Sequence, residues 1–549
     1  MKKRYITLSL MLLITASYGQ SKGTEKADKL VESYQYVAAI DEYLKLAQTK
    51  EADTYVYTKL ADSYYTIFNT EEASKWYAKA VEGKVSAETH FRYAQSLKTA
   101  GKYQEANQQM DVFASMEPND SRAKEYRANP NYIPSLTNKS KLFDIAETTI
   151  KSKGQSDFGA VLTNDNVLYF VSTRNASGRK DKWANQPYLD IFESIRNTDG
   201  TLSEPKAINE LNTPFHDGPV ALSQDGNTMF FARDSHSAGQ YEKDKKANVK
   251  VGQQGLYKAT KVDGKWTQIT ALPFNSTSYS VSHPSLSKDG KTLFFASNMP
   301  GGLGESDIWK VEFEDNIYGT PENVGTKINS PGKENFPFIT DDNVLYFASS
   351  GKQGLGGLDV FKIDLNTSEE AQNVGKPVNS EKDDFSFSLN TVLNTGYFSS
   401  NRNGLDAIYS AVPVAKEVIV PVPVVPAEVI ITDSEVLLNP IYFEFNKSNI
   451  TAQGAGELDK LVKVMNDHPT MVILVKSHTD TKGSASYNLN LSEHRAQSTV
   501  QYLISKGISS GRISGKGFGS STPKIHCGSN CTDEDHAQNR RSEFMIISK

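Results

Sequence analysis

The residues best suited to bind a charged ligand lie near the C-terminus of the chain. Asp480 stands in the polar turn HTDTKGSAS, and Arg495 follows in the predicted helix LSEHRAQSTVQYLISKGI. A carboxylate and a planar guanidinium held by the backbone can bind the cationic and the anionic group of one ligand. A ligand lacking either charge leaves one of them unpaired, so the pair favours an amino-acid head group. The alternative is that Asp480 and Arg495 form an internal salt bridge and a helix contact.

Alternating strands and helices are predicted to position these two side chains. We expect strands at 441–445, 471–480 and 540–548, and amphipathic helices at 456–467 and 491–508. Ser492 is predicted to cap the second helix and Gly507 to end it. The result is an α/β sandwich whose polar site lies where strand ends meet helix starts.

Several motifs of this region resemble the OmpA-like peptidoglycan-binding domain over about residues 435–549. They are YFEFNKSNI, SHTDTKGSASYNLNLSEHRAQSTVQYLISKGI, ISGKGFGSSTP and NRRSEFMI. The resemblance implies that the ligand is the diaminopimelate residue of the stem peptide, with Asp480 on its ammonium and Arg495 on its carboxylate. His494 departs from the Arg common at its position and is expected to point elsewhere. Further positions that match the family's pocket are Phe443, Asn446, Thr479, Asn488, Leu491 and Arg540.

Length, composition and the first residues indicate an exported protein of several domains. A chain of 549 residues with a net charge of -5 and no Lys/Arg-rich block is an ordinary globular protein and does not favour nucleic-acid binding. Lys2, Lys3 and Arg4 precede an apolar run too short to span a bilayer. Residues 1–19 are therefore predicted to be a signal peptide, and its removal takes the charge from -5 to -8 (three cations lost).

Two cysteines, Cys527 and Cys531, stand in the stretch HCGSNC. In an exported protein such a close pair is typical of a disulfide. The alternative is a zinc site that adds His526 and His536, but the ligand spacing is poor for it. We therefore expect a disulfide-closed loop, and neither a metal ion nor another cofactor.

Residues 20–130 contain a helical repeat with spacings of 34 and 33 residues. The period, with alanines where helices would meet, resembles tetratricopeptide repeats. Its concave groove is predicted either to grip a partner segment or to stay empty as a spacer. The recurring positions are Ala27, Ala61 and Ala94, then Ala39, Ala73 and Ala106, then Tyr43, Tyr77 and Met110.

Residues 138–411 contain a β repeat in five copies. Each copy has a tight turn, a short apolar strand such as DNVLYFVSTR (165–174), and a second strand such as DIFES. The pattern resembles TolB-type and WD-like propellers, so we predict five blades, with six as the alternative. KLFDIAETTI (141–150) is expected to supply the outer strand of the last blade and close the ring.

The Gly-rich loops PGGLGESD, QGLGGLD and NRNGLD recur at one place in successive copies. We interpret them as turns in which an Asp side chain caps backbone N–H groups, rather than as ligand sites. The sequence contains no pattern typical of a catalytic triad or carboxylate pair, so no enzymatic activity is expected. A Pro-rich stretch at 412–432 is predicted to be a stiff linker, and the OmpA-like domain follows at 433–549.

The predicted fold is therefore multidomain: all-α helical repeats, an all-β propeller and an α/β OmpA-like sandwich. This order is typical of OmpA-family envelope proteins of Bacteroidetes, and resembles the peptidoglycan-associated component of type 9 secretion and gliding systems, which carries an additional β domain. It predicts a non-enzymatic periplasmic adaptor that binds peptidoglycan and tethers an outer-membrane protein or complex. The alternative is a propeller-based ligand sensor or hydrolase anchored to the cell wall.

Overall fold

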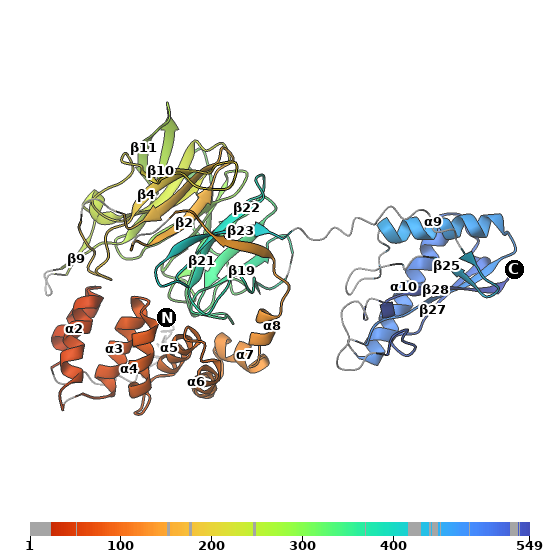
Figure 1. Ribbon diagram of the computed structural model, residues 1–549, viewed down its shortest axis with the longest axis horizontal. Helices are drawn as coiled ribbons and strands as arrows, with labels where there is room; N and C mark the ends of the chain where they lie inside the picture. Colours follow the sequence, from red (N-terminus) through yellow and green to blue (C-terminus); the bar gives the residue numbers. More distant parts are fainter. Residues whose placement is uncertain are drawn as a thin grey trace, which may run out of the picture. The chain divides into compact units, whose positions relative to one another are not determined.

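The computed structural model describes residues 23–50, 52–150, 154–174, 178–244, 249–367, 369–414, 430–438, 441, 448, 450, 452–481, 484–526, 536 and 538–549. The chain divides into two compact units, residues 1–415 and 416–549 (Figure 1), and each is described by itself. The predicted signal peptide and most of the predicted linker lie outside the described residues. In the described part of the chain, no helix has the length and apolarity needed to cross a membrane.

The first unit begins with helices over the segment that the sequence predicts to be a helical repeat. Capping explains where several of them start, because the side chains of Asp53, Asn69 and Ser86 accept hydrogen bonds from N–H groups of the following turn. The described helices of this unit are α1 (Glu25–Glu32), α2 (Tyr36–Ala47), α3 (Thr54–Thr66), α4 (Thr70–Ala80), α5 (Ala87–Lys98), α6 (Tyr103–Met116), α7 (Ser121–Ala128) and α8 (Ile133–Thr137).

The recurring positions of the predicted helical repeat lie inside the helical core. Tyr77 is fully buried, and its hydroxyl donates to Asp62 Oδ1 at 2.7 Å. Tyr43 is equally buried and donates to Asp28 Oδ1 at 2.6 Å, one repeat earlier. The alanines let neighbouring helices approach closely, as the period predicts; they are Ala27, Ala39, Ala61, Ala73, Ala94 and Ala106, each buried.

Five antiparallel sheets follow, matching the five copies of the β repeat. They are ordered β2-β3-β4-β5, β6-β7-β10-β11, β12-β13-β14-β15 with β16 also on β14, β17-β18-β19-β20, and β1-β23-β22-β21; β8 and β9 pair separately. The bounds are β1 (Phe143–Glu147), β2 (Asp157–Leu162), β3 (Val167–Ser172), β4 (Asp190–Ile195), β5 (Lys206–Ala207), β6 (Asp217–Leu222), β7 (Thr228–Asp234), β8 (Glu242–Asp244), β9 (Val249–Val251), β10 (Gln254–Val262), β11 (Lys265–Ala271), β12 (Val281–Leu286), β13 (Thr292–Ser297), β14 (Asp307–Glu314), β15 (Ile317–Tyr318), β16 (Glu322–Asn323), β17 (Glu334–Ile339), β18 (Val344–Ser349), β19 (Asp359–Asp364), β20 (Gln372–Asn373), β21 (Asp384–Asn390), β22 (Thr395–Ser400) and β23 (Ala407–Pro413).

The first strands of the five sheets contact one another in a cycle. β2 contacts β6, β6 contacts β12, β12 contacts β17, β17 contacts β21, and β21 contacts β2. The last sheet is completed by β1, which pairs antiparallel with β23 from Phe143↔Pro413 to Glu147↔Tyr409. The predicted pairing of segment 141–150 with the last copy is therefore confirmed, while the five-bladed propeller itself stays a prediction.

Aromatic rings fill the space between the first strands at the end where those strands begin. Phe336 stacks on His283 with ring centroids 3.8 Å apart, and on Phe385 at 5.0 Å. Phe158 packs edge-on against Phe336 at 6.2 Å. Burial lowers the pKa of His283 to about 3, so its ring is neutral and packs as an aromatic side chain. This aromatic plug (Phe158, His283, Phe336 and Phe385) obstructs the centre of the cycle.

An acid–arginine pair recurs in three of the five sheets, between the start of the first strand and the end of the second. In the fourth sheet Glu334 takes the place of the acid, and hydroxyl groups surround it in place of an arginine. Its carboxylate accepts from Ser330 Oγ at 2.6 Å and from Ser349 Oγ at 2.5 Å. The three pairs are Asp157–Arg174, Asp217–Arg233 and Asp384–Arg402.

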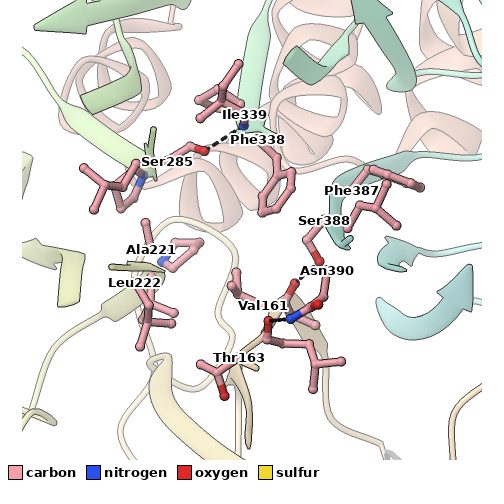
Figure 2. A pocket seen from close by; sticks show the side chains of 18 of the residues that line it. Val161, Thr163, Ala221, Leu222, Ser285, Phe338, Ile339, Phe387, Ser388 and Asn390 are labelled. Carbon is pink, nitrogen blue, oxygen red and sulfur yellow. Dashed lines mark hydrogen bonds between the residues drawn. The ribbon is translucent and has the colours of Figure 1, made fainter. Parts of the chain in front are cut away.

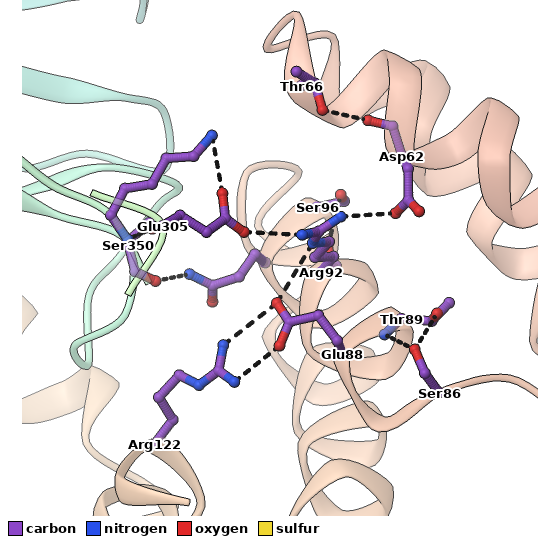
Figure 3. Close-up of polar contacts among 12 residues, drawn as sticks. Asp62, Thr66, Ser86, Glu88, Thr89, Arg92, Ser96, Arg122, Glu305 and Ser350 are labelled. Carbon is purple, nitrogen blue, oxygen red and sulfur yellow. Dashed lines mark hydrogen bonds and ion pairs between the residues drawn. The ribbon is translucent and has the colours of Figure 1, made fainter. Parts of the chain in front are cut away.

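The helices pack directly on the loops of the sheets within this unit (Figures 1 and 3). Arg92 on α5 forms ion pairs with Asp62 on α3 at 3.1 Å and with Glu305 in the β13–β14 loop at 2.9 Å. Gln95, one turn further along α5, donates to the carbonyl oxygen of Ser350 at 2.6 Å. The surface of α5 around Arg92 and Gln95 is therefore occupied by the protein's own sheet loops.

The predicted capping role of aspartates is confirmed in two Gly-rich loops. Asp307 accepts a hydrogen bond from Gly304 N at 3.1 Å, and Asp359 accepts from Leu355 N and Gly356 N at 2.9 Å each. The second loop also accepts from the helices: Tyr103 donates to Leu355 O and Tyr132 to Gly354 O. These loops are thus structural turns, and the helical segment packs against them.

The second unit is a five-stranded sheet of order β24-β25-β28-β26-β27 with two helices. β26 runs parallel to β27 and antiparallel to β28. Leu458, Met465, Ile473 and Leu503 lie in the core between helices and sheet. The bounds are β24 (Ile430–Ile431), β25 (Glu435–Leu437), α9 (Ala452–Asp467), β26 (Val472–Ser477), α10 (Ala485–Ser505), β27 (Ile513–Gly517) and β28 (Ser542–Ser548).

The helix at 456–467 and the strands at 471–480 and 540–548 agree with α9, β26 and β28, whereas α10 begins earlier than predicted. The predicted strand at 441–445 lies almost wholly outside the described residues and stays a prediction. Three strands were not predicted: β24, β25 and the parallel strand β27, whose sequence ISGKG does not look like a strand by β-propensity.

Candidate functional site

The candidate site is built at the end of β26, the strand between its partners β28 and β27. The strand leads into His478, Thr479 and Asp480, all of which are buried. The backbone of this turn is fixed from both sides, because His478 N donates to Arg541 O at 2.9 Å and Thr479 N donates to Gly519 O at 3.0 Å. Asp480 is therefore held by rigid neighbouring segments rather than by a mobile loop.

The helix α10 forms the second wall, and its start corrects the sequence expectation. It begins seven residues before Ser492, at Ala485, with Ser484 as the cap that accepts from Tyr487 N at 3.2 Å. Ser492 lies buried inside the helix, where its hydroxyl accepts a hydrogen bond from Gly519 N at 2.8 Å. The helix ends at Ser505, and Gly507, the predicted stop, follows the cap Lys506 with a φ of 98°.

Glycines allow α10 to lie close to β27. A Cβ on Gly517 would stand 2.3 Å from Glu493 N, so only glycine fits without a backbone shift. Gly517 N also donates to the Glu493 carboxylate at 2.7 Å. The GKGFG stretch of the sequence thus sets the distance between strand and helix, and with it the position of Arg495.

The structure brings Asp480, Arg495 and Arg540 together. Arg540 Nη1 lies 2.6 Å from Asp480 Oδ2, and its side chain is 34% exposed. Arg495 is only 2% exposed, the largest side chain among the fully buried ones. Burial and then the positive charge of Arg540 lower the pKa of Arg495, whereas the Asp480 charge acts in the opposite direction. One carboxylate therefore lies near two guanidinium groups.

The remaining predicted site residues fall into two groups. Asn488 is buried on α10 and donates from Nδ2 to Asp480 O at 3.2 Å, which holds the turn against the helix. Leu491 is half-buried and His494 is exposed, so His494 points away from the site as expected. The predicted Phe443, Asn446, Cys527 and Cys531 lie outside the described residues.

Two features of the site were not predicted. Thr479 was named by resemblance alone, and the sequence did not show that its Oγ1 is buried without a hydrogen-bond partner among the described residues. His478 is buried beside it; its Nδ1 lies 2.9 Å from Thr522 Oγ1, and its ring stacks on Phe518 at 5.5 Å. Burial, followed by the charge of Arg541, lowers the pKa of His478 to about 4. The ring is thus a neutral support of the turn.

The chemistry available to this arrangement is binding by charge. The carboxylate of Asp480 can accept hydrogen bonds from an ammonium group, and the two guanidinium groups can donate to a carboxylate. Within the described residues, no group of three His, Cys, Asp or Glu side chains could hold a metal ion. The site is therefore suited to a zwitterion.

Comparison with known proteins places the same region in a family. The OmpA family model matches residues 442–540. The peptidoglycan-associated lipoprotein of Buchnera aphidicola subsp. Baizongia pistaciae is 36% identical over 107 residues, 20% of this chain and 60% of that protein. Outer membrane protein A of Shigella flexneri is 41% identical over 100 residues, 18% of this chain and 29% of that protein.

A solved structure is also similar to a part of the chain. The crystal structure of the peptidoglycan-associated lipoprotein from Burkholderia pseudomallei has 25% sequence identity and a TM-score of 0.18, covering 19% of this chain and 87% of that one. The chain spans less than two thirds of the length of each of these two curated relatives, and the family match lies in its C-terminal unit.

Proposed function

From the OmpA-like domain at residues 442–540, we propose that this protein binds peptidoglycan in the periplasm through its second unit. The observation that carries the proposal is the juxtaposition of Asp480 with the guanidinium groups of Arg495 and Arg540 at the end of β26. The diaminopimelate residue of the stem peptide presents an ammonium and a carboxylate on one carbon, which matches these charges.

Asp480 already has a partner before the ligand binds. Arg540 occupies Asp480 Oδ2 in the structure, and the ligand's ammonium would share or take over this carboxylate. Arg540 is then able to turn toward the ligand's carboxylate, because about a third of its side chain is exposed. Arg495 stays fixed by burial in α10 and acts as the permanent cation of the pocket.

The first unit supplies the second half of the proposed function. We infer that its five sheets form a five-bladed propeller, that its helices are tetratricopeptide-like repeats, and that together they tether an outer-membrane protein or complex. The cyclic contacts of the first strands support the propeller, and the aromatic plug favours an adaptor over a propeller with an open catalytic channel. We further propose that the protein acts in type 9 secretion or gliding, and only the order of its domains supports this proposal.

The test of wall binding uses the full-length mature protein and purified sacculi that contain diaminopimelate. Asp480→Asn and Arg495→Met are each expected to weaken cosedimentation by about 10- to 100-fold, because each leaves a ligand charge unpaired. Lys463→Met and Asp433→Asn are matched controls, since both side chains are exposed in the same unit. Sacculi with lysine in place of diaminopimelate should bind more weakly. Equal binding by all variants would contradict the proposal.

A further inference from the structure

The centre of the five sheets is closed at one end and open at the other. The helices contact the loops near the starts of the first strands, through Arg92, Gln95 and Tyr132. At the other end, where those strands finish, a cavity of about 140 Å³ opens (Figure 2). We call this cavity the cup; it lies between the ends of β2, β6, β12, β17 and β21 and the turns that follow them.

One side chain from each first strand forms the wall of the cup. These residues are Val161, Ala221, Ser285, Phe338 and Ser388, and Figure 2 shows them around the opening. The two serine hydroxyls are already used: Ser285 Oγ accepts from Ile339 N at 2.9 Å, and Ser388 Oγ donates to Ala160 O at 2.6 Å. Val161, Ala221 and Phe338 therefore offer apolar contact, while polar groups make up about half of the surface of the cup. His283 and Phe336 of the aromatic plug form the floor.

The rim of the cup is acidic. We define it by the turns between the first and second strands, which carry five exposed aspartates and two lysines: Asp165, Asp225, Asp289, Asp341, Asp342, Lys288 and Lys291. Lys291 is paired with Glu314 at 2.9 Å, and Lys288 with Asp341 at 3.3 Å. Hydrogen bonds from their turns lower the pKa values of Asp225 and Asp289, which keeps both charged. Because both lysines are paired, the other four aspartates give the rim a net negative charge.

An exposed apolar residue stands on this rim. Val392 is 67% exposed and belongs to the turn between β21 and β22. The neighbouring Thr391 donates to Asp341 Oδ2 at 3.2 Å, and Asn390 donates to Leu162 O at 3.1 Å, so the turn is held to both adjacent sheets. Val392 is thus a fixed apolar contact at the entrance rather than a side chain on a loose loop.

We propose that the cup is the docking site for a projecting loop of a partner protein, in which one apolar side chain is flanked by Lys or Arg. The volume suits one side chain and is too small for a helix, whose diameter is about 10 Å. The apolar side chains of the wall match the inserted side chain, and the acidic rim matches flanking cations. The inference rests on the proposed tethering function and names the face and the chemistry of its partner.

The first test uses two short disulfide-closed peptides as probes. Both carry the same central Leu, which is flanked by Lys in one and by Glu in the other. The full-length protein is expected to bind the Lys-flanked peptide at least about tenfold more tightly at low salt, with the difference shrinking as salt rises. Val392→Arg should abolish this preference, because it adds a cation and removes the apolar contact. Ile317→Arg is the matched control, since Ile317 is 77% exposed on β15, away from the cup.

The second test locates the partner in cells. A photo-crosslinking amino acid replaces Val392 or, as the control, Ile317, and the crosslinked peptide is sequenced. A partner segment with an apolar residue beside Lys or Arg, recovered from position 392 but not from 317, supports the proposal. An acidic segment, a glycan or no specific product at 392, or equal binding of the two peptides, overturns it.

Failure of the cup and failure of the wall anchor give different results. Sacculus cosedimentation is measured on the same Val392→Arg protein and is expected to be unchanged, because the anchor pocket lies in the other unit. If the protein with the crosslinking amino acid at position 392 gives no specific product but binds sacculi normally, only the cup is rejected. If that protein crosslinks to a partner but does not bind sacculi, only the anchor is rejected.

Discussion

Two acid–arginine pairs in this protein have similar geometry and different surroundings. In the last sheet of the first unit, Asp384 is fully buried and Arg402 also donates to the backbone carbonyls of Pro377 and Val378. In the second unit, Arg540 is 34% exposed, and within the described residues its guanidinium has no acceptor besides Asp480.

This difference distinguishes a structural ion pair from an ion pair that a ligand can replace. The Arg402 guanidinium donates to several fixed oxygens, so breaking the pair leaves a buried carboxylate without its counter-ion. The Arg540 guanidinium reaches solvent, so leaving Asp480 costs little and water or a ligand can replace the contact. Distance alone does not distinguish the two pairs; burial and the number of acceptors do.

The largest expected effect is on the stability of the first unit. Arg402→Ala should lower the free energy of unfolding by about 3–5 kcal/mol, because Asp384 keeps its hydrogen bonds from Ser380 but is left buried without a counter-ion. Arg540→Ala should change the stability of the second unit by less than about 1 kcal/mol. Tryptophan fluorescence in urea reports the first unit, since Trp76, Trp183, Trp266 and Trp309 all lie in it. Circular dichroism follows both units, and comparable losses in the two variants would show that the comparison is wrong.

The next prediction compares the two arginines of the binding site, Arg495 and Arg540. Arg495→Ala should weaken binding of a diaminopimelate-containing stem peptide by about 100-fold, because its guanidinium is fixed by burial. Arg540→Ala should weaken it by less than about tenfold, since the lost contact is offset by an Asp480 that no longer shares its carboxylate with Arg540. Calorimetric titration measures both affinities. A larger loss for Arg540→Ala would assign the main anionic contact to the exposed arginine.

A buried acid without an arginine offers a third case for comparison. Burial raises the pKa of Glu334 to about 7, while hydrogen bonds from Ser330 and Ser349 and the charge of Lys352 act against it. The folded state then binds a proton more tightly than the unfolded chain, so Glu334 favours folding most below its unfolded pKa, and this contribution is lost as pH rises through 7. Glu334→Gln should therefore stabilise the first unit by about 1–3 kcal/mol at pH 8 and flatten the fall in stability between pH 5 and 8.

The pH experiment has a matched control on the neighbouring sheet. Glu312 is exposed on β14, and Glu312→Gln should leave the pH profile unchanged. Asp359, Asp384 and Asp406 also have pKa values raised by burial, so a smaller slope should remain in Glu334→Gln. Parallel profiles for wild type and Glu334→Gln would show that Glu334 is charged in the folded protein at neutral pH.

The smallest expected effect concerns a single hydroxyl. Thr479→Val removes a buried oxygen that has no hydrogen-bond partner among the described residues, so the second unit should become more stable by up to about 1 kcal/mol. If this hydroxyl binds the ligand, affinity should fall by about three- to tenfold in the same variant. Thermal unfolding and calorimetric titration measure the two effects. A destabilised variant with unchanged affinity would assign Thr479 a purely structural role.

The sequence was most informative where local periodicity or a repeat sets the structure. The five sheets, the pairing of β1 with β23 and the end of α10 just before Gly507 follow from turn residues and strand patterns. Arg174 and Arg402 also recur at one place in the repeat, and aligning them with Asp157 and Asp384 could have revealed two of the ion pairs. Arg233 stands two residues earlier, where the other two copies have Ser172 and Ser400.

Contacts between segments far apart in the chain were not available from these patterns. Ser492 looked like a helix cap because serine precedes an amphipathic run, yet its hydroxyl serves Gly519, which arrives from another element. In the same way Arg540, 60 residues after Asp480, forms an ion pair with it that the sequence did not predict. The packing of α5 on the sheet loops depends on Arg92 meeting Glu305, which no local period encodes.

The pairing of β1 with β23 has a mechanical consequence. β23 is the last described strand before the linker segment, and it lies between β1 and β22 with backbone pairing along both edges. Val414 N also donates to Leu142 O just beyond the pairing. A pulling force transmitted along β23 from its C-terminal end would load these hydrogen bonds together in shear, instead of opening them one at a time. The pairing of β1 with β23 thus places a strand bonded on both edges where tension would enter the first unit.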